Sequence, residues 1–396
     1  NKDKKVLNVP HLRFPEFRGE WEKCSIQDYG EVVTGNTPPT SHAEYYENGS
    51  YLWASPADLG INKNITETKT KLSLSGFKKT RNIPKGSVLV TCIGSTIGKM
   101  GMATETMSSN QQINSIVVND KSNSDFVYYA ICRAFPRYLS EVSVQAVPIL
   151  SKSNFEKLPN YTTCRDEQAK IGYFLNLLDE RIATQNKVIE DLKKLKSAII
   201  EEHYKQSEKQ SVPVADLGEP FSVSNLSKDD LTDTGTPCVI YGELFTTYGE
   251  IINHVESYTK RSKGMTLSKK GDLLFPSSTT VDAVSLIAPS NINVDNVILG
   301  GDMFGIHISS NYDAQYLSYY FNHIAKKQLA KYAKGSTIIH LHYKDIEKAN
   351  LLLPCLIEQN KIAHNLILLD EKIHNENAYL QLIVKQKQYM LRHMFI

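Results

Sequence analysis

Several short segments carry residue types that catalytic sites use. GNTPPT (35–40) contains Asn-x-Pro-Pro and is close to the Asn-Pro-Pro-aromatic motif with which amino-methyltransferases hold a flipped base. Here Thr37 separates the asparagine from the prolines, Thr40 replaces the aromatic residue, and no Gly-rich cofactor loop accompanies the segment. A turn is therefore the favoured interpretation.

Other segments fail the spacing that their chemistry needs. GSTIGKM (94–100) resembles a phosphate-binding loop, but only three residues separate its glycines and Met100 follows Lys99. His340 and His342 alternate, so an extended segment would place both on one face, yet the sequence around them lacks further metal ligands. We find no nuclease carboxylate cluster with its lysine. We therefore predict binding rather than catalysis, and no metal site.

Two basic segments supply that binding chemistry. Residues 74–86 and 256–271 are rich in lysine and arginine, and each contains a Lys-Gly step at its end. Phosphates are contacted by such cations, whereas base edges are read by Asn, Gln, Arg, Ser and Thr. The candidate DNA-binding residues are Lys78, Lys79, Arg81, Ser95, Thr96, Lys99, Gln111, Gln112, Lys260, Arg261, Lys263, Ser277, Ser278, Thr279, His340 and His342. The alternative, that single members of this set are solvated loop residues, stays open.

The overall composition limits the partners and the compartment. The 45 Lys and Arg nearly balance the 43 Asp and Glu, so a polyanion must be met by local patches and not by a large basic field. The six cysteines are scattered without a C-x-x-C pair, which favours a reducing cytoplasm. No apolar run approaches the roughly 20 residues that a membrane helix needs.

A long internal repeat organises the chain. EQAKIGYFLNLLDERI (167–182) recurs as EQNKIAHNLILLDEKI (358–373), with ten of sixteen residues identical and an offset of 191. Upstream the match weakens: Lys85-Gly86 resembles Lys270-Gly271, and SIQDYGEVVTG resembles VADLGEPFSVS. We predict an N-terminal extended arm (1–20), body 1 (21–160), tail 1 (161–211), body 2 (212–351) and tail 2 (352–396).

The tails are predicted to be long helices that pair with each other. Apolar residues step by three and four over about four heptads, which is typical of a coiled-coil seam. The seam residues are Ile171, Leu175, Leu178, Ile182, Ile189, Leu192, Ile362, Leu366, Leu369, Ile373, Leu380 and Ile383. Polar residues interrupt both seams at matched places, Gln185 with Glu376 and Lys196 with Lys387. These residues would fix the register in which the two helices pair. The alternative is a surface helix packed on its own domain.

The bodies are predicted to be α+β. SVLVTCIG, SIVVND, DLLFPSS and VSLIAPS are strand-like, and amphipathic helices are expected from Asp125 and from Asp313. Two similar bodies joined by two antiparallel helices imply a pseudo-twofold molecule. Duplex DNA has the same pseudo-symmetry, so this shape suits two half-sites at a fixed gap.

The ordered motifs resemble those of the specificity subunit of type I restriction–modification systems. The resemblance rests on LRFPEFRGEW, IPKGSVLVTCIGSTIGKMGMA, SNQQINSI, the paired EQ-x-KI…LLDE-x-I segments and the order body, helix, body, helix. It implies two target recognition domains, each reading half of a bipartite DNA site, and conserved helices that form an antiparallel coiled coil. The matched tail residues are Glu167, Gln168, Ile171, Leu178, Asp179, Glu180 and Ile182, and Glu358, Gln359, Ile362, Leu369, Asp370, Glu371 and Ile373. Body 2 departs from the family pattern, with SSTTVDAVS in place of GS-x-IGK.

The resemblance also implies partners and a division of labour. The helices would set the gap between the half-sites and dock two methyltransferase subunits, and restriction subunits would join through that assembly. S-adenosylmethionine, ATP and Mg²⁺ would be bound by those partners, and this chain would carry no active site and no cofactor. Two other functions stay open: a self-contained DNA methyltransferase or nuclease with unrecognised motifs, and a coiled-coil scaffold without a nucleic-acid role.

Overall fold

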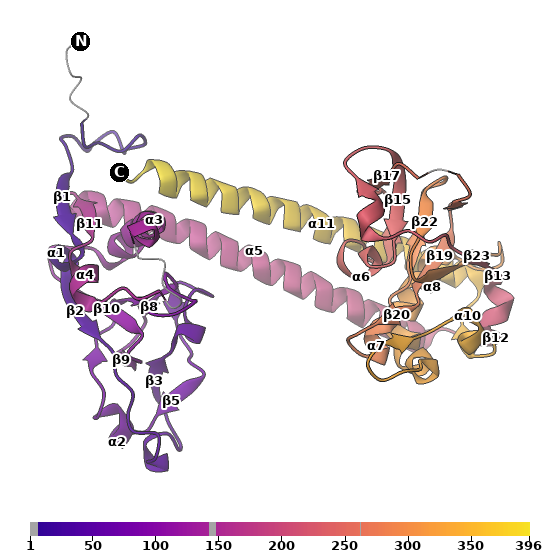
Figure 1. The fold of residues 1–396 in the computed structure, drawn as a ribbon, viewed down its shortest axis with the longest axis horizontal. Coiled ribbons are helices and arrows are strands. Elements are labelled where there is room, and N and C mark those ends of the chain that lie inside the picture. Colours follow the sequence, from indigo (N-terminus) through magenta and orange to yellow (C-terminus); the bar gives the residue numbers. More distant parts are fainter. Residues whose placement is uncertain (1–6, 142–147, 262) are drawn as a thin grey trace, which may run out of the picture. The chain divides into compact units, whose positions relative to one another are not determined.

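The computed structural model describes residues 7–141, 148–261 and 263–396, and these divide into two compact units. Unit 1 comprises Asn1–Asn186 and Ala378–Ile396, and unit 2 comprises Lys187–Asn377. Each unit therefore holds one body together with part of each long helix (Figure 1). Within the described residues, no helix is long and apolar enough to cross a membrane.

The two tails are helical, as predicted. Helix α5 spans Arg165–Gln206 and helix α11 spans Leu356–His393. Both begin with acidic residues in the first turn and end with basic residues in the last turn, which complements the helix dipole. Inside unit 1 the residue pairs 181–379 and 179–387 are in contact, so the end of α11 runs antiparallel to the start of α5.

A five-stranded sheet is the centre of each unit, and the two sheets have the same strand order. In unit 1 the order is β2 (Gly30–Thr34), β10 (Ile113–Val118), β7 (Val88–Thr91), β8 (Met100–Ala103), β4 (Asn64–Ile65). In unit 2 it is β13 (Gly218–Ser222), β23 (Met303–Ile308), β19 (Asp272–Pro276), β21 (Ser290–Ile292), β16 (Ile251–Ile252). In both sheets the last strand is parallel to its neighbour and the other pairs are antiparallel.

A second sheet accompanies each central one. Its strands in unit 1 are β5 (Thr70–Leu72), β3 (Tyr51–Ala54), β9 (Met107–Ser109) and β6 (Asn82–Ile83). In unit 2 they are β14 (Leu231–Thr232), β17 (Ser257–Thr259), β15 (Thr236–Ile240), β22 (Ile298–Gly300) and β18 (Thr266–Leu267). The two-stranded sheets are β1 (Glu22–Ser25) with β11 (Pro159–Thr162), β12 (Gln210–Pro213) with β25 (Asn350–Leu353), and β20 (Ser278–Thr279) with β24 (Ile339–His340).

The remaining helices are short apart from α3 (Ser124–Glu141). They are α1 (Ile26–Tyr29), α2 (Leu74–Phe77), α4 (Lys152–Glu156), α6 (Glu243–Thr246), α7 (Ala283–Leu286), α8 (Ala314–Tyr320), α9 (Lys326–Leu329) and α10 (Tyr343–Ile346). The helix expected from Asp313 is present as α8 and α9, joined by a π-helical segment, Phe321–Ala325. The strand expected at VSLIAPS is wrong, because Asp282 caps helix α7 by accepting a hydrogen bond from the Ser285 N–H at 2.8 Å.

Paired glycines explain the weak upstream repeat. A Cβ on Gly30 would lie 2.0 Å from the Val117 carbonyl oxygen, and one on Gly218 would lie 1.9 Å from that of His307. Each glycine thus lets its strand approach the same neighbour, β10 or β23. Gly86 and Gly271 both have positive φ, +83° and +95°, in the turn before β7 or β19.

The helix seams pack on the bodies as well as on each other. Ile171, Leu175 and Leu178 share one buried cluster with Phe126 of body 1 and with Met394 near the end of α11. In unit 2, Ile362 and Leu366 share a cluster with Leu317 of body 2 and with Ile200 of α5. Both explanations that the sequence left open are therefore realised, within the same buried clusters. Ile189 and Ile383 are also buried, and Ile182, Leu192, Leu369, Ile373 and Leu380 are half-buried.

Candidate nucleic-acid interface and helix junctions

In body 1 the predicted polar loops meet at one surface. The Asn36 side chain donates to the Lys79 carbonyl at 2.9 Å and accepts from the Arg81 N–H at 2.8 Å. The Thr37 hydroxyl donates to Oε1 of Gln111 at 2.6 Å. The loop after β2, the loop after α2 and the loop after β9 are thus joined by side-chain hydrogen bonds.

The lysines and the arginine of this surface differ in their hydrogen bonding to the protein. Lys78 and Lys79 are exposed, whereas the Arg81 guanidinium donates to the Thr34 carbonyl at 2.8 Å and so helps to hold the loop. Gly35 permits the close fit, since a Cβ there would lie 2.2 Å from the Ser109 carbonyl oxygen.

The segment GSTIGK forms the turn between β7 and β8. Gly94 and Gly98 have φ values of +96° and +90°, Ser95 and Lys99 are exposed, and Thr96 is half-buried. The Gln112 side chain donates to the Ile93 carbonyl at 3.5 Å, so this turn adjoins the loop that carries Gln111. The loop that carries Gln111 and Gln112 therefore adjoins both the loops joined by Asn36 and Thr37 and the turn that carries Ser95, Thr96 and Lys99.

In body 2 the predicted residues divide into exposed and covered ones. Lys260, Arg261 and Lys263 are exposed, and the Arg261 guanidinium also donates to the Asn225 carbonyl at 3.0 Å. His340 and His342 are exposed, with ring centroids 6.2 Å apart.

The predicted role of Ser277 and Ser278 does not fit their position. Their exposed fractions are 3% and 9%, because the chain there continues from β19 into β20, which pairs with β24. Their side chains are covered in this conformation, and Thr279 is half-buried.

Asn36 and Thr37 are the residues that sequence reasoning missed. GNTPPT fails the spacing of a methyltransferase motif, which predicts only a turn. The overlooked signal was a glycine followed by two hydrogen-bonding side chains directly after a strand.

The repeated tail motif forms two equivalent, partly buried junctions. In junction 1, Asp179 accepts from the Tyr129 hydroxyl at 2.6 Å and forms an ion pair with Lys387. In junction 2, Asp370 accepts from the Tyr319 hydroxyl at 2.6 Å and from Lys196 at 2.8 Å. Each lysine also lies over the tyrosine ring, 5.6 Å from the centroid in junction 1 and 4.8 Å in junction 2.

The glutamine of each EQ pair ties the same body helix to the tail. Gln168 accepts from the Asn123 N–H at 2.9 Å, and Gln359 accepts from the Asp313 N–H at 3.0 Å. Asn123 and Asp313 in turn accept from the first-turn N–H groups of α3 and α8. The EQ…LLDE repeat is therefore the surface on which α3 or α8 sits.

The surroundings of the two junctions differ. Lys63 reaches junction 1 and pairs with Asp125 at 2.5 Å, and burial lowers the pKa of Lys63. Glu250 reaches junction 2, 2.9 Å from Lys196 and 2.8 Å from His323. Burial alone would raise the pKa of Glu250, but the hydrogen bond from His323 and the charge of Lys196 outweigh it and lower the pKa to about 2. Burial, together with the adjacent Asp179 or Asp370, raises the pKa of Tyr129 and Tyr319.

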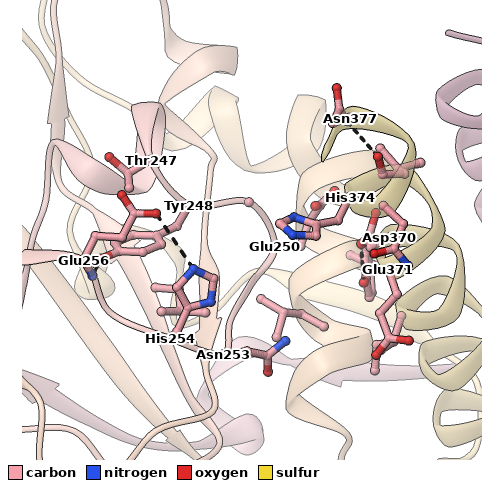
Figure 2. Close-up of a pocket in the computed structure, with 17 residues that line it drawn as sticks. Thr247, Tyr248, Glu250, Asn253, His254, Glu256, Asp370, Glu371, His374 and Asn377 are labelled. Carbon is pink, nitrogen blue, oxygen red and sulfur yellow. Dashed lines mark hydrogen bonds and ion pairs between the residues drawn. The ribbon is translucent and has the colours of Figure 1, made fainter. Parts of the chain in front are cut away.

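Each junction borders a cleft, which lies between the body and α11 in unit 2 and between the body and both long helices in unit 1. The cleft of unit 2, about 720 Å³, is lined by Glu250, Tyr319 and Asp370 of the junction region. Figure 2 shows His254 and Glu256 of the body loop on one side of it, and Glu371 and His374 of α11 on the other. The unit 1 cleft, about 1060 Å³, is lined by Lys63, Asp179 and Lys387. Among the described residues, no group of three or more His, Cys, Asp or Glu side chains is placed to hold a metal ion.

The duplicated body, mounted twice on the same helix motif, defines a two-domain protein. Residues 18–194 and 206–386 match the model of the type I restriction modification DNA specificity domain, and the chain belongs to this family. The family resemblance found in the sequence is thereby confirmed.

Curated relatives agree with this assignment. The chain is 30% identical over 151 residues to the type I restriction enzyme HindI specificity subunit of Haemophilus influenzae, covering 37% of this chain and 32% of that one. It is 30% identical over 188 residues to the MjaIX specificity subunit of Methanocaldococcus jannaschii, covering 44% and 42%. The chain thus matches less than half the length of these two relatives. The MjaVIII specificity subunit of the same archaeon is 23% identical, over 98% of this chain and 95% of its own length.

Solved structures show the same fold. The type I restriction–modification S subunit from M. genitalium superposes with a TM-score of 0.63 at 16% identity, covering 98% of this chain and 99% of its own. A chain from a study of complex assembly and conformational transition of the type I R-M system gives a TM-score of 0.59 at 13% identity, covering 96% and 98%.

Proposed function

We propose that this chain is the DNA-recognition subunit of a type I restriction–modification complex, with each body reading one half of a bipartite duplex site. The observation that carries the proposal is the pair of bodies with one topology but different exposed loops, mounted on one repeated helix motif. A shared scaffold with divergent loops is what two different half-sites require.

Base reading in body 1 is assigned to the surface built by Asn36, Thr37 and Gln111, with Lys78 and Lys79 at its edge. Amide and hydroxyl groups can pair with base edges, and the lysines with phosphates. In body 2 the exposed candidates are Lys260, Arg261, Lys263, His340 and His342. The near-neutral charge of the chain predicts weak, salt-sensitive DNA binding in the absence of partners.

The helices are proposed to dock two methyltransferase subunits and to set the gap between half-sites. Leu177 and Leu368, which are equivalent in the repeat, are 43% and 51% exposed, so each tail offers an apolar side chain at the same position. Restriction subunits would join through that assembly in the cytoplasm. Methyl transfer with S-adenosylmethionine, and ATP- and Mg²⁺-dependent restriction, would belong to these partners, and this chain would be non-catalytic.

The test is to map methylated adenines in cells that express the chain with its methyltransferase subunit. We expect one bipartite motif, and replacement of residues 21–160 by body 1 of another family member should change only one half of it. Methyl transfer to DNA by the purified chain alone would instead favour a self-contained methyltransferase. An unchanged motif after the replacement would contradict DNA reading by body 1.

A further inference from the structure

We infer that each body is positioned by a lysine from the tail of the other repeat: Lys387 positions body 1, and Lys196 positions body 2. Lys196 lies on α5, the helix that follows body 1, yet its ion-pair partner is Asp370 on α11 in unit 2. Lys387 lies on α11, the helix that follows body 2, yet it pairs with Asp179 in unit 1. The ion pair in each junction is therefore crossed with respect to the repeat.

Each junction is linked to the central sheet of its body through one body helix. Tyr129 is on α3, which packs on β7 and β8, and the turn between these strands carries Ser95 and Lys99. Tyr319 is on α8, which packs on the equivalent strands β19 and β21. A shift of the tyrosine at the Asp–Tyr contact would therefore move α3 or α8, and with it the central strands of one body.

The ion pairs of the two junctions are partly buried, so the loss of one partner is costly. The Lys196 and Asp370 side chains are 10% and 34% exposed, and those of Lys387 and Asp179 are 25% and 23% exposed. Removing the lysine leaves the aspartate with only its tyrosine bond in a partly buried site, which favours rearrangement of the tyrosine and its helix. The nearby pair Lys194–Glu190 has side chains that are 68% and 64% exposed. Loss of this lysine should therefore leave the positions of the neighbouring helices unchanged.

The DNA readout of this inference rests on the proposed function, and a second readout does not. The variants are K196M and K387M, and K194M is the matched control on α5. Discrimination is the ratio of methylation at the cognate site to methylation at sites with one changed base pair. The changed base pair is placed in one half of the site or in the other. We expect K196M to lower discrimination in the half-site read by body 2 by about tenfold while that of body 1 stays within about twofold, and K387M to do the reverse. K196R should restore most of the loss, because it keeps the charge.

The second readout is hydrogen exchange in the chain alone. Uptake in α8 should rise in K196M and in Y319F, and uptake in α3 should rise in K387M and in Y129F, with K194M unchanged. Y319F and Y129F delete only a hydroxyl and so test the junction even where a lysine variant folds poorly.

Two results overturn the inference: K196M loosening α3, or both lysine variants weakening the two halves equally. If the wild-type complex writes no bipartite methylation, the proposed function fails, and hydrogen exchange alone then decides which lysine holds which body.

Discussion

The two bodies share strand order, paired glycines and a Lys–Asp–Tyr junction, but the charges around these features differ. The unit 1 cleft is lined by three lysines and three carboxylates, and the unit 2 cleft by four carboxylates and two histidines. The glutamate of the EQ pair is fully buried against Arg13 in unit 1, where it is Glu167, and exposed in unit 2, where it is Glu358. The backbone positions conserved between the repeats carry the fold, and the electrostatics at equivalent positions have diverged.

The largest expected difference between the units lies at that glutamate. Glu167 accepts from Nε and Nη2 of Arg13 at 2.7 and 2.8 Å, whereas exposed Glu358 meets the Ser207 hydroxyl at 3.1 Å. We expect E167Q to lower the free energy of unfolding of unit 1 by about 3–5 kcal/mol. E358Q should change that of unit 2 by less than about 0.5 kcal/mol. Denaturant unfolding followed by hydrogen exchange of each unit measures both, and equal effects would contradict the comparison.

The paired glycines should respond alike. G30A and G218A place a Cβ against the backbone of β10 or β23, so the strands must separate. We expect each to cost about 3 kcal/mol of unfolding free energy in its own unit. G242A is the control, since nothing lies within 4 Å of its added Cβ. A cost in only one unit would show that the two strand pairs are not equivalent.

Acid should weaken unit 2 through Glu250. Its pKa falls from 4.5 to about 2 on folding, so its contribution is present above pH 4.5 and is lost as the pH drops towards 2. The contribution is at most about 3 kcal/mol, from 1.36 kcal/mol for each pKa unit. Unfolding followed between pH 6 and pH 2.5 should show a smaller acid loss in E250Q than in the wild type. E358Q, which changes an exposed glutamate of the same unit, is the control, and parallel curves for E250Q and the wild type would refute the assignment.

The smallest difference is expected at the start of each body. Asp28 accepts from the N–H and the hydroxyl of Ser25, both at 2.7 Å, and these bonds lower the pKa of Asp28. Pro213 stands at the equivalent position in unit 2 and has no N–H to offer Asp216. D28A should cost about 1 kcal/mol of unit 1 stability and D216A should be near neutral in unit 2, as thermal unfolding can check.

Periodicity and repetition made the helices and the central strands predictable, because both are local signals. The seam also marked Lys196 and Lys387 as special, but not their partners, since those depend on which tail segments share a unit. The sequence SSTT indicates a polar loop in which Ser277 and Ser278 are accessible, whereas the pairing of β20 with β24, 60 to 62 residues further along the chain, covers them. The role of Asn36 was hidden for the same reason: its partners Lys79 and Arg81 come from a distant loop.

The return of the chain's last residues to unit 1 also sets the order in which the protein can finish folding during synthesis. Phe395 and Met394 fill the core of unit 1, where the Phe395 ring lies 6.0 Å from that of Trp21. At about 5–20 residues per second, the ribosome adds Phe395 roughly 20–75 s after Trp21. Body 1 is therefore translated first and completed last, because part of its core lacks its final residues until the end of α11 is made.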